Sequence, residues 1–413
     1  ELPGTPLPPE PPPMTGSPES GFTATESVSA PMPPDLQAQG IPLPPPEPVL
    51  TRRGRIRLGV VVVGDNILTH RGRYRKVLAV ADKGQQPTLT FTTENGRRVC
   101  AEMRHPFLTP RGWVEARDLR VGDVLAAVTA VEDLSDQISA EEARLLGYLV
   151  GDGSVTNSPT FTNADEQVLA DFERCAASLG FVTTRRDQTP SAKAKNAKFT
   201  TIGIRGALPW LERHGLRSKG SYTKRIPQAV INSGQATISN FLGAYWSCDG
   251  NISVRHTGAR GSIYLATCTT VGEGLAKDVQ HALLRLGIQA RVRKRTRPLV
   301  SKRQGSTYTY WMVMACSHAE TAKFNRLSGL CRRKFNLLDN ATSTEFEQGP
   351  LHEDAIVAIE DTGSGECRCL TVEEDHSFTA NDIAVHNSLL TDVFWPAWEW
   401  GGLGKAHRRY VTF

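Results

Sequence analysis

The alternation of hydrophobic and polar positions divides the chain into a strand-rich part near each end and a mixed part between them. Short apolar runs and alternating stretches, broken by glycines, fill residues 49–135 and predict β-strands. Within them, residues 88–102 predict a hairpin that turns at Asn95 and Gly96. Strand-like segments return in residues 342–387. We therefore expect one β-rich domain built from two separated halves.

Residues 136–341, between these halves, have helical spacing. Ser139 is a good helix N-cap, and apolar residues then recur at helical intervals as far as Asp152. A second helix ends in the same way at Asp249, again followed by glycine. Each helix precedes strand-like segments and a further helix, so an αββα-type unit occurs twice. The pattern predicts an α+β domain inserted into the β-rich one.

The two ends of the chain differ from the rest. Residues 1–48 are rich in proline, which predicts a disordered segment without a core, and residues 388–413 change composition once more. The 413 residues leave room for two or three domains. Neither a membrane-spanning apolar run nor a secretory signal is recognisable, so we expect a cytoplasmic protein, monomeric and without a membrane partner. The eight scattered cysteines argue against a disulfide scaffold.

Histidine and asparagine carry the candidate chemistry of the β-rich halves. The segment HSFTANDIAVHNS (376–388) and the segment RHPFLTPRGWVEARDLRVGD (104–123) resemble the splicing blocks of inteins. The resemblance covers most of residues 49–135 and 342–388. It implies a Hint domain, a horseshoe-like all-β fold that splices itself out of a host protein without a cofactor.

The resemblance assigns roles that suit the side chains. Asn387 would attack its own following peptide bond and form a succinimide, an intramolecular step that positioning accelerates. His386 and His376 would move the proton, since histidine titrates near neutrality. The hydroxyl of Ser388 would accept the upstream acyl group. His105 would protonate the leaving nitrogen at the upstream junction.

The upstream junction has no obvious nucleophile. Inteins usually begin with Cys or Ser, whereas this chain has no cysteine before Cys100. The start could be Glu1, or it could lie near Ile41 or Pro42. Some inteins use an internal cysteine in the strand before the block histidine instead, and Cys369 occupies that position. Its thiolate would attack the upstream peptide bond.

Three positions depart from the family pattern. Inteins that use the internal cysteine carry a Trp where this chain has Phe107 and a Thr where it has Val385. The Thr usual three residues before the block histidine is replaced by Glu102. Complete splicing and C-terminal cleavage alone are therefore both open.

The inserted domain carries a second pair of motifs. LLGYLVGDG (145–153) and FLGAYWSCDG (241–250) resemble the paired motifs of LAGLIDADG homing endonucleases. The resemblance implies close packing of the two helices through Gly147 and Ala244. Asp152 and Asp249 would then bind Mg²⁺ together and cut both DNA strands. The glycine after each of these carboxylates suits a left-handed helix cap.

Basic residues in the insert form two clusters, and clusters of this kind suit a polyanion or a solvated face. The endonuclease resemblance places them in the DNA major groove, and it leaves room for a catalytic lysine, for which Lys198 and Lys224 are the candidates. The candidate DNA contacts are Arg185, Arg186, Lys198, Lys224, Arg291, Arg293 and Arg295.

Residues 388–402, SLLTDVFWPAWEWGG, resemble the helix after the Walker A loop of phage large terminase subunits. The expected partners are therefore double-stranded DNA at the insertion site and the flanking exteins of a terminase-like host. Three functions stay open: an intein with an active homing endonuclease, a splicing-defective remnant that only cuts DNA, and a non-catalytic DNA-binding protein.

Overall fold

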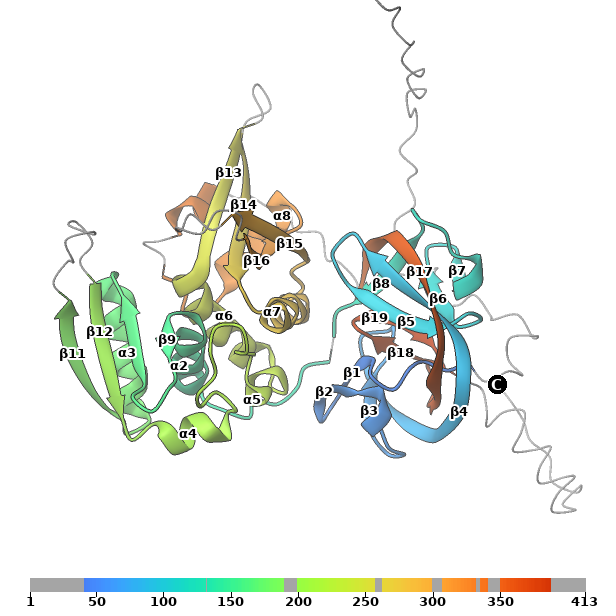
Figure 1. Cartoon of the computed structure of the whole chain (residues 1–413), viewed down its shortest axis with the longest axis horizontal. Coiled ribbons are helices and arrows are strands. Elements are labelled where there is room, and N and C mark those ends of the chain that lie inside the picture. The colour runs from blue at the N-terminus through green and yellow to red at the C-terminus, as the bar shows by residue number, and fades with distance from the viewer. Residues whose placement is uncertain are drawn as a thin grey trace, which may run out of the picture.

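The computed structural model describes residues 41–130, 132–188, 199–256, 262–298, 307–331, 335–340 and 350–387. Two lobes lie side by side (Figure 1). The β-rich lobe contains both ends of the described chain, and the other lobe is the insert. Within these residues, no helix combines the length and the apolar character needed to cross a membrane.

One large sheet forms the β-rich domain and joins its two halves. Strand β4 from the first half pairs antiparallel with β17 from the second along almost all of their length, from Val77 opposite Val372 to Thr93 opposite Ile356. Register shifts bend this pair, as bulges do in curved sheets. The remaining strands continue from it in the order β18-β1-β3-β4-β17-β8-β19-β6-β7, with β2 on β1 and β5 on β4. The strands are β1 (Pro48–Thr51), β2 (Gly54–Arg57), β3 (Asn66–Leu68), β4 (Tyr74–Thr93), β5 (Arg98–Glu102), β6 (Pro106–Thr109), β7 (Gly112–Glu115), β8 (Val124–Val128), β17 (Leu351–Val372), β18 (Ser377–Ala380) and β19 (Ile383–His386).

Two features of this domain compare directly with the sequence. The predicted hairpin at residues 88–102 is confirmed, because β4 pairs with β5 around a turn in which Gly96 has a φ of +85°. The prediction that residues 1–48 are disordered is wrong for residues 41–48, whereas residues 1–40 lie outside the described part of the chain. Ile41 and Leu43 are buried, and Leu43 exchanges two backbone hydrogen bonds with Arg368 of β17. The prolines here do not build a core of their own, but they suit an extended segment laid against an existing strand.

The insert repeats one pattern twice. A long helix, two strands and a second helix follow one another as α2-β9-β10-α3 and again as α6-β13-β14-α7, which confirms the predicted αββα units. Two further strands complete each four-stranded sheet, in the orders β11-β12-β10-β9 and β13-β14-β16-β15. The elements are α2 (Ala140–Gly151), β9 (Gly153–Ser154), β10 (Thr160–Asn163), α3 (Glu166–Ser178), β11 (Val182–Gln188), β12 (Phe199–Arg205), α4 (Leu208–Arg213), α5 (Gln228–Ile231), α6 (Gln235–Asp249), β13 (Gly250–His256), β14 (Ser262–Thr270), α7 (Glu273–Arg285), β15 (Ala290–Pro298), β16 (Thr307–Ala315) and α8 (His318–Ala322).

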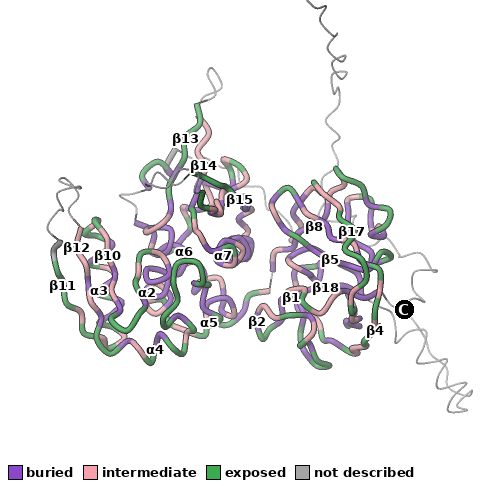
Figure 2. The backbone as a smooth tube through the Cα atoms, in the orientation of Figure 1, coloured by how far each residue is buried: buried purple, intermediate pink, exposed green. Residues whose placement is uncertain are grey.

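Helices α2 and α6 lie in the middle of the insert and are largely buried (Figure 2). They approach so closely that a Cβ on Gly147 would lie 2.4 Å from the Phe241 carbonyl oxygen and 2.9 Å from the Ala244 Cβ. Small residues therefore permit the contact, as predicted.

The predicted left-handed caps at the ends of α2 and α6 are wrong. Neither Gly153 nor Gly250 has a positive φ. Glycine is required there for space instead, because a Cβ would lie 2.6 Å from the Leu149 Cα in one case and 2.1 Å from the Trp246 ring in the other.

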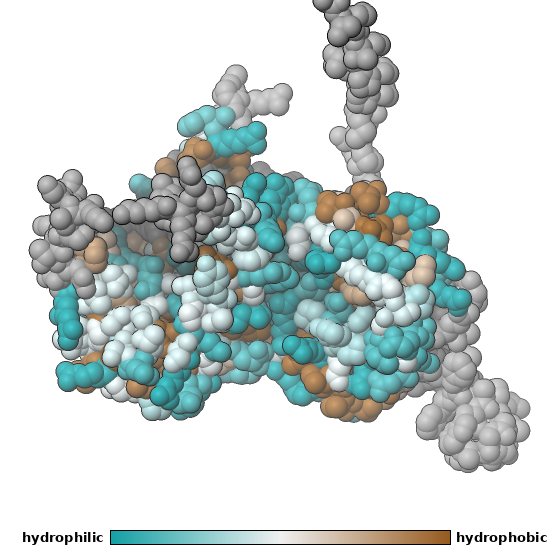
Figure 3. Space-filling model, in the orientation of Figure 1, coloured by the Kyte–Doolittle hydropathy of each residue, from teal (hydrophilic) through white to brown (hydrophobic). Residues whose placement is uncertain are grey.

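The outer surface of the insert is mainly hydrophilic or neutral on the face shown in Figure 3, whereas hydrophobic residues gather at two places on the β-rich lobe. Val60, Val62 and Val63 are more than half exposed in that lobe, although Val61 between them is buried. Exposed valines of this kind are common on protein surfaces and need no partner to explain them.

Candidate functional site

Asn387 directly follows strand β19 and is completely buried. The β18–β19 hairpin brings it back beside the start of β18, where its backbone N–H donates to the His376 carbonyl oxygen at 3.0 Å. Its side-chain Nδ2 donates to the Val372 carbonyl oxygen at 3.2 Å. The backbone N–H and the side-chain Nδ2 of Asn387 are thus both held by backbone carbonyl oxygens. Ser388, the residue after it, lies outside the described residues.

His386 lies against the carbonyl that would be attacked. Its Nδ1 is 2.7 Å from the carbonyl oxygen of Asn387. A carbonyl oxygen only accepts, so Nδ1 carries the proton and donates. Burial lowers the pKa of His386 to about 4, which keeps the ring neutral at pH 7. A neutral ring donating through Nδ1 can polarise the carbonyl and stabilise an oxyanion on it.

Two aromatic residues that the sequence reading missed surround His386. Trp113 of β7 contacts the His386 ring edge-on, with centroids 4.9 Å apart, and contacts His70 in the same manner at 5.6 Å. The Nδ1 atom of His70 is 2.6 Å from the Ser377 hydroxyl. His376 lies near enough that a positive charge on its ring would lower the pKa of His386 further. No sequence signal links these residues, since they come from three separate segments.

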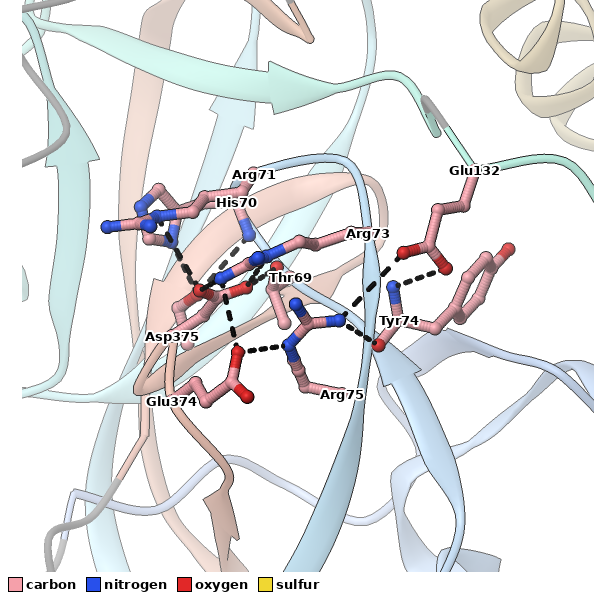
Figure 4. Close-up of polar contacts among 10 residues, drawn as sticks. Thr69, His70, Arg71, Arg73, Tyr74, Arg75, Glu132, Glu374 and Asp375 are labelled. Atoms are coloured by element: carbon pink, nitrogen blue, oxygen red, sulfur yellow. Dashed lines mark hydrogen bonds and ion pairs between the residues drawn. The ribbon is translucent and has the colours of Figure 1, made fainter.

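The turn that carries His376 is anchored from the neighbouring strands (Figure 4). Glu374 and His376 have φ values of +57° and +47°, a left-handed conformation that costs energy for residues other than glycine. Asp375 between them accepts from Arg73 Nε at 2.9 Å and from the Thr69 hydroxyl at 2.7 Å. Its side chain is 1% exposed, so these bonds are shielded from water. They hold the strained turn in place.

The upstream half of the site forms around His105, which is fully buried. Burial lowers its pKa to about 3, while the backbone of Pro42 and Ile41 beside the ring acts in the opposite direction. The carbonyl oxygen of Pro42 accepts from the Glu102 N–H at 3.3 Å. The structure thus brings the block histidine to Ile41 and Pro42, one of the two candidate starts.

Cys369 lies on the other side of the same short segment. Leu43 pairs with Arg368, so in an antiparallel pair Pro42 runs past Cys369. Cys369 is 1% exposed. Cys367 is similarly buried, and burial raises its pKa to about 12, so its thiol stays protonated. The strand therefore presents two cysteines, and the antiparallel register places Cys369 opposite Pro42 and Cys367 opposite Pro44, so Cys369 is the one nearer in register to Ile41.

Two of the three positions that depart from the family pattern face each other. Phe107 of β6 pairs with Val385 of β19, and both are fully buried. The Phe107 ring contacts His105 edge-on at 5.8 Å and the Phe91 ring at 5.1 Å. A contact between Phe and Val thus stands where the family pattern has Trp and Thr, and it lacks the threonine hydroxyl.

Four buried histidines predict a pH dependence of stability. The pKa is lowered by burial to about 4 in His70, His352 and His386 and to about 3 in His105, whereas an unfolded histidine titrates near 6.5. Between these values the unfolded chain binds more protons, so stability is greatest above pH 6.5 and is lost as the pH falls towards 4. One such histidine contributes about 3 kcal/mol to the free energy of unfolding at neutral pH. We expect the free energy of unfolding, measured with urea, to fall by at least about 3 kcal/mol between pH 7 and pH 4.5. Glu47 opposes this change, because burial raises its pKa to about 7.

A single substitution provides the control for this titration. His352 Nε2 is 2.6 Å from the Thr129 hydroxyl, a contact that glutamine reproduces without a titrating group. His352→Gln should flatten the pH dependence by one histidine's share. A free energy of unfolding that does not change between pH 7 and pH 4.5 would contradict the assignment of these rings as neutral.

In the insert, Asp152 caps the C-terminus of α2 and Asp249 is the last residue of α6. Both carboxylates act on the ammonium of Lys224, so all three groups are close. Asp152 accepts from Asn163 Nδ2 at 2.9 Å. Within the described residues, no group of three or more His, Cys, Asp or Glu could hold a metal ion. Two carboxylates fit Mg²⁺, which in nuclease sites takes few protein ligands and keeps waters and phosphate oxygens.

The prediction that Lys224 contacts DNA is wrong for this structure. Its side chain is 4% exposed, and Nζ donates to the carbonyl oxygens of Leu149, Val150 and Gly153 at 2.8, 3.1 and 2.6 Å. The ammonium thus satisfies the unpaired carbonyls at the C-terminus of α2. Burial lowers its pKa, and the nearby carboxylates oppose that shift.

The first basic strand divides its two arginines between opposite faces. Arg185 forms ion pairs with Glu173 and Glu166 of helix α3, at 2.7 and 2.6 Å, which compensate its charge in this structure, and its DNA contact stays a prediction. Arg186 lies on the other face and lines a hollow of about 780 Å³ with Thr184 and Thr201. Lys198 lies outside the described residues.

The arginines of the second basic strand, β15, differ along the length of the strand, from a paired residue at its start to exposed residues further on. Arg291 forms an ion pair with Glu94 and donates to Asn95 Oδ1, both in the β-rich domain, and its DNA contact stays a prediction. Arg293 and Arg295 are exposed further along the strand. They have the same parity as Arg291 and stand opposite Met312 and Tyr310 of β16, on one face of the sheet.

Comparison with known proteins agrees with this arrangement. The family model described as the intein splicing domain matches residues 60–387. The chain therefore belongs to the intein splicing domain family, whose chemistry is autocatalytic protein splicing.

Individual relatives are more distant. The replicative DNA helicase DnaB of Rhodothermus marinus is 28% identical over 79% of this chain and 43% of its own length. The RecA protein of Mycobacterium tuberculosis is 30% identical over 58% of this chain and 30% of its own length. A crystal structure of a DnaB intein from Synechocystis covers 84% of this chain and 99% of its own, at 10% identity and a TM-score of 0.30. The chain spans less than half the length of these two full-length relatives.

Proposed function

We propose that Asn387 carries out the C-terminal step of splicing. Its Nδ2 attacks its own carbonyl carbon, the bond to the Ser388 nitrogen breaks, and that nitrogen takes up a proton, leaving a succinimide on the upstream chain. The hydrogen bond from His386 Nδ1 to the Asn387 carbonyl oxygen carries this proposal, because it stabilises the charge that develops there. His376, beside them, accepts the proton from the attacking amide. Release of the peptide 388–413 tests this step, and Asn387→Ala should stop it.

We infer that the upstream junction lies on the N-terminal side of Ile41 or Pro42. The segment containing these residues runs between His105 and Cys369 and is the described part of the chain that reaches both. The Cys369 sulfur attacks the carbonyl carbon of the junction and forms a thioester. His105 passes a proton to the departing nitrogen. The Ser388 hydroxyl then takes over the acyl group as an ester.

The insert is proposed to be a Mg²⁺-dependent homing endonuclease of the LAGLIDADG type. Two helices packed through glycine place Asp152 and Asp249 together, each at an electronegative helix end. Bound Mg²⁺ would stabilise the attacking and leaving oxygens of a phosphodiester. The exposed side chains of Arg186, Arg293 and Arg295 lie on sheet faces that could follow a duplex backbone.

Removal of one carboxylate should abolish cutting without preventing binding. Asp152→Asn is expected to lower the rate of DNA cleavage at least about 100-fold, since the metal loses a charged ligand. The substrate is a plasmid in which a terminase-like Walker A coding sequence joins the codons for residues 388–413, incubated with MgCl₂. Nicked and linear products are separated on agarose, and binding is measured by gel shift.

A matched variant isolates the effect of charge. Glu141→Gln removes a carboxylate from the first turn of the same helix, at its opposite end, and should cut at the unmodified rate. Cleavage by Asp152→Asn at that rate, or no cleavage by the unmodified chain, would contradict the proposed nuclease function. A chain that cuts DNA but never releases residues 388–413 would be the splicing-defective remnant.

A further inference from the structure

The tip of the β18–β19 hairpin is held by the insert rather than by the β-rich domain alone. Asn381 and Asp382 form this tip with φ values of +46° and +70°, both left-handed. Asp382 Oδ1 is 2.7 Å from Nδ1 of His281, a residue of helix α7 in the insert. His281 is 2% exposed and Asp382 is 8% exposed, so the pair is shielded from water.

The hydrogen bonds of the two His281 ring nitrogens indicate the protonation state of the ring. Nε2 of His281 is buried and has no hydrogen-bond partner in the part of the chain that the structure describes. A bare Nε2 costs less there than a buried N–H without a partner, so the ring is neutral and Nδ1–H donates to the carboxylate. Burial lowers the pKa of His281, in agreement with a neutral ring, although Asp382 acts against the shift. The result is a short charge-assisted hydrogen bond.

A second contact supports the same tip. Arg55 of β2 donates from Nη2 to Asn381 Oδ1 at 2.6 Å, and its Nη1 is 3.9 Å from Asp278 Oδ1. Asp278 and His281 are three residues apart on α7 and therefore share a face of that helix. One helix face of the insert thus contacts both residues of the tip, directly at Asp382 and through Arg55 at Asn381.

The tip is directly connected to the reacting residues. The four residues of β19 separate Asp382 from Asn387, which lies five residues on and therefore roughly 17 Å away along the strand at about 3.3 Å per residue. This strand is paired in register with β18, from Ala380 opposite Ile383 to Ser377 opposite His386. A shift of the tip therefore moves His386 and Asn387 along with it.

We propose that His281 is a positioning residue for Asn387 cyclisation, acting through its hydrogen bond to Asp382 at the hairpin tip. The insert is then a working part of the splicing domain as well as a nuclease. This inference rests on the proposed C-terminal step. Misplacement of an attacking group by about 1 Å is enough to slow such a reaction on the order of 100-fold.

The test compares the release of peptide 388–413 by the full chain and by two variants at His281. His281→Leu removes the donor and is expected to slow release at least ten-fold. His281→Asn places an N–H near the position of Nδ1 and should restore release to within three-fold of the unmodified chain. Asp382→Gly, which accepts the left-handed backbone, should slow release as much as His281→Leu does. The double variant should be no slower than either alone.

Two measurements separate positioning from a general loss of stability. Gln280, the neighbouring residue on α7, donates to the Asn95 carbonyl oxygen at 2.7 Å and touches the β4–β5 turn instead. Gln280→Ala should release the peptide at the unmodified rate. Upstream cleavage by dithiothreitol should change less than two-fold in His281→Leu.

Several results would overturn the positioning role. They are unmodified release in His281→Leu, equal slowing in Gln280→Ala, and equal loss of both cleavage steps together with a lowered melting temperature. Failure of the unmodified chain to release the peptide would instead contradict the proposed C-terminal step itself.

Discussion

Replacing Cys369 with alanine is expected to stop cleavage at the upstream junction, lowering its rate at least about 1,000-fold, as removal of a nucleophile does in enzymes with covalent intermediates. The physical reason is the position of the sulfur. Cys369 belongs to the strand against which Leu43 pairs, and the bonds before Ile41 and Pro42 lie in the same segment. The fully buried His105 ring lies beside the backbone of those residues.

The measurement uses an Asn387→Ala background, in which the C-terminal step cannot run. Dithiothreitol cleaves a thioester, so it should release an N-terminal fragment ending near residue 40 or 41 from the chain with Cys369. Mass spectrometry of that fragment gives the position of the junction. The Cys369→Ala chain should release none.

Cys367→Ala is the matched control, since Cys367 is equally buried two residues away, and burial raises its pKa to about 12. It should leave the upstream cleavage unchanged. Equal loss in both variants would mean that the strand, and not the Cys369 sulfur, is needed. Dithiothreitol treatment of the chain with Cys369 that releases no fragment ending near residue 40 or 41 would exclude the junction proposed here.

The sequence was sufficient for the parts of the site that are local. Asn387 attacks the peptide bond that directly follows it, and His386, which donates to the same carbonyl, is its neighbour in the chain. Both residues can therefore be recognised in the local sequence. Asp152 and Asp249 are local in the same sense, because each lies at the C-terminal end of a helix that the sequence predicts. Helical spacing and the switch to strand-like segments were enough to predict the two αββα units of the insert.

The sequence was insufficient wherever distant segments meet. His70, in the turn between β3 and β4, and Trp113 of β7 reach His386 because β3, β4, β7 and β19 belong to one sheet. Lys224 was assigned to DNA from its charge, although three backbone carbonyls at a helix end bind it more closely. The ion pairs of Arg185 and Arg291 could not be predicted either, because a local run of arginines does not reveal which carboxylates face each one.

Asn387→Ala is expected to have the largest effect of all, lowering the rate of C-terminal cleavage at least about 100,000-fold. An intramolecular nucleophile in the correct geometry has an effective concentration of that order, and alanine removes it completely. The fold should persist, because the buried side chain donates only to the Val372 carbonyl oxygen. That carbonyl loses one neutral hydrogen bond, a cost of about 1 kcal/mol.

The most direct test is the intact mass of the purified chain after overnight incubation, measured beside the Asn387→Ala chain. The unmodified chain should lose the mass of residues 388–413 together with that of any upstream segment it removes, and the larger product should lack the mass of one further water because it ends in a succinimide. The variant should keep residues 388–413. Equal loss of the peptide from both chains, or its retention by both, would contradict the central role of Asn387.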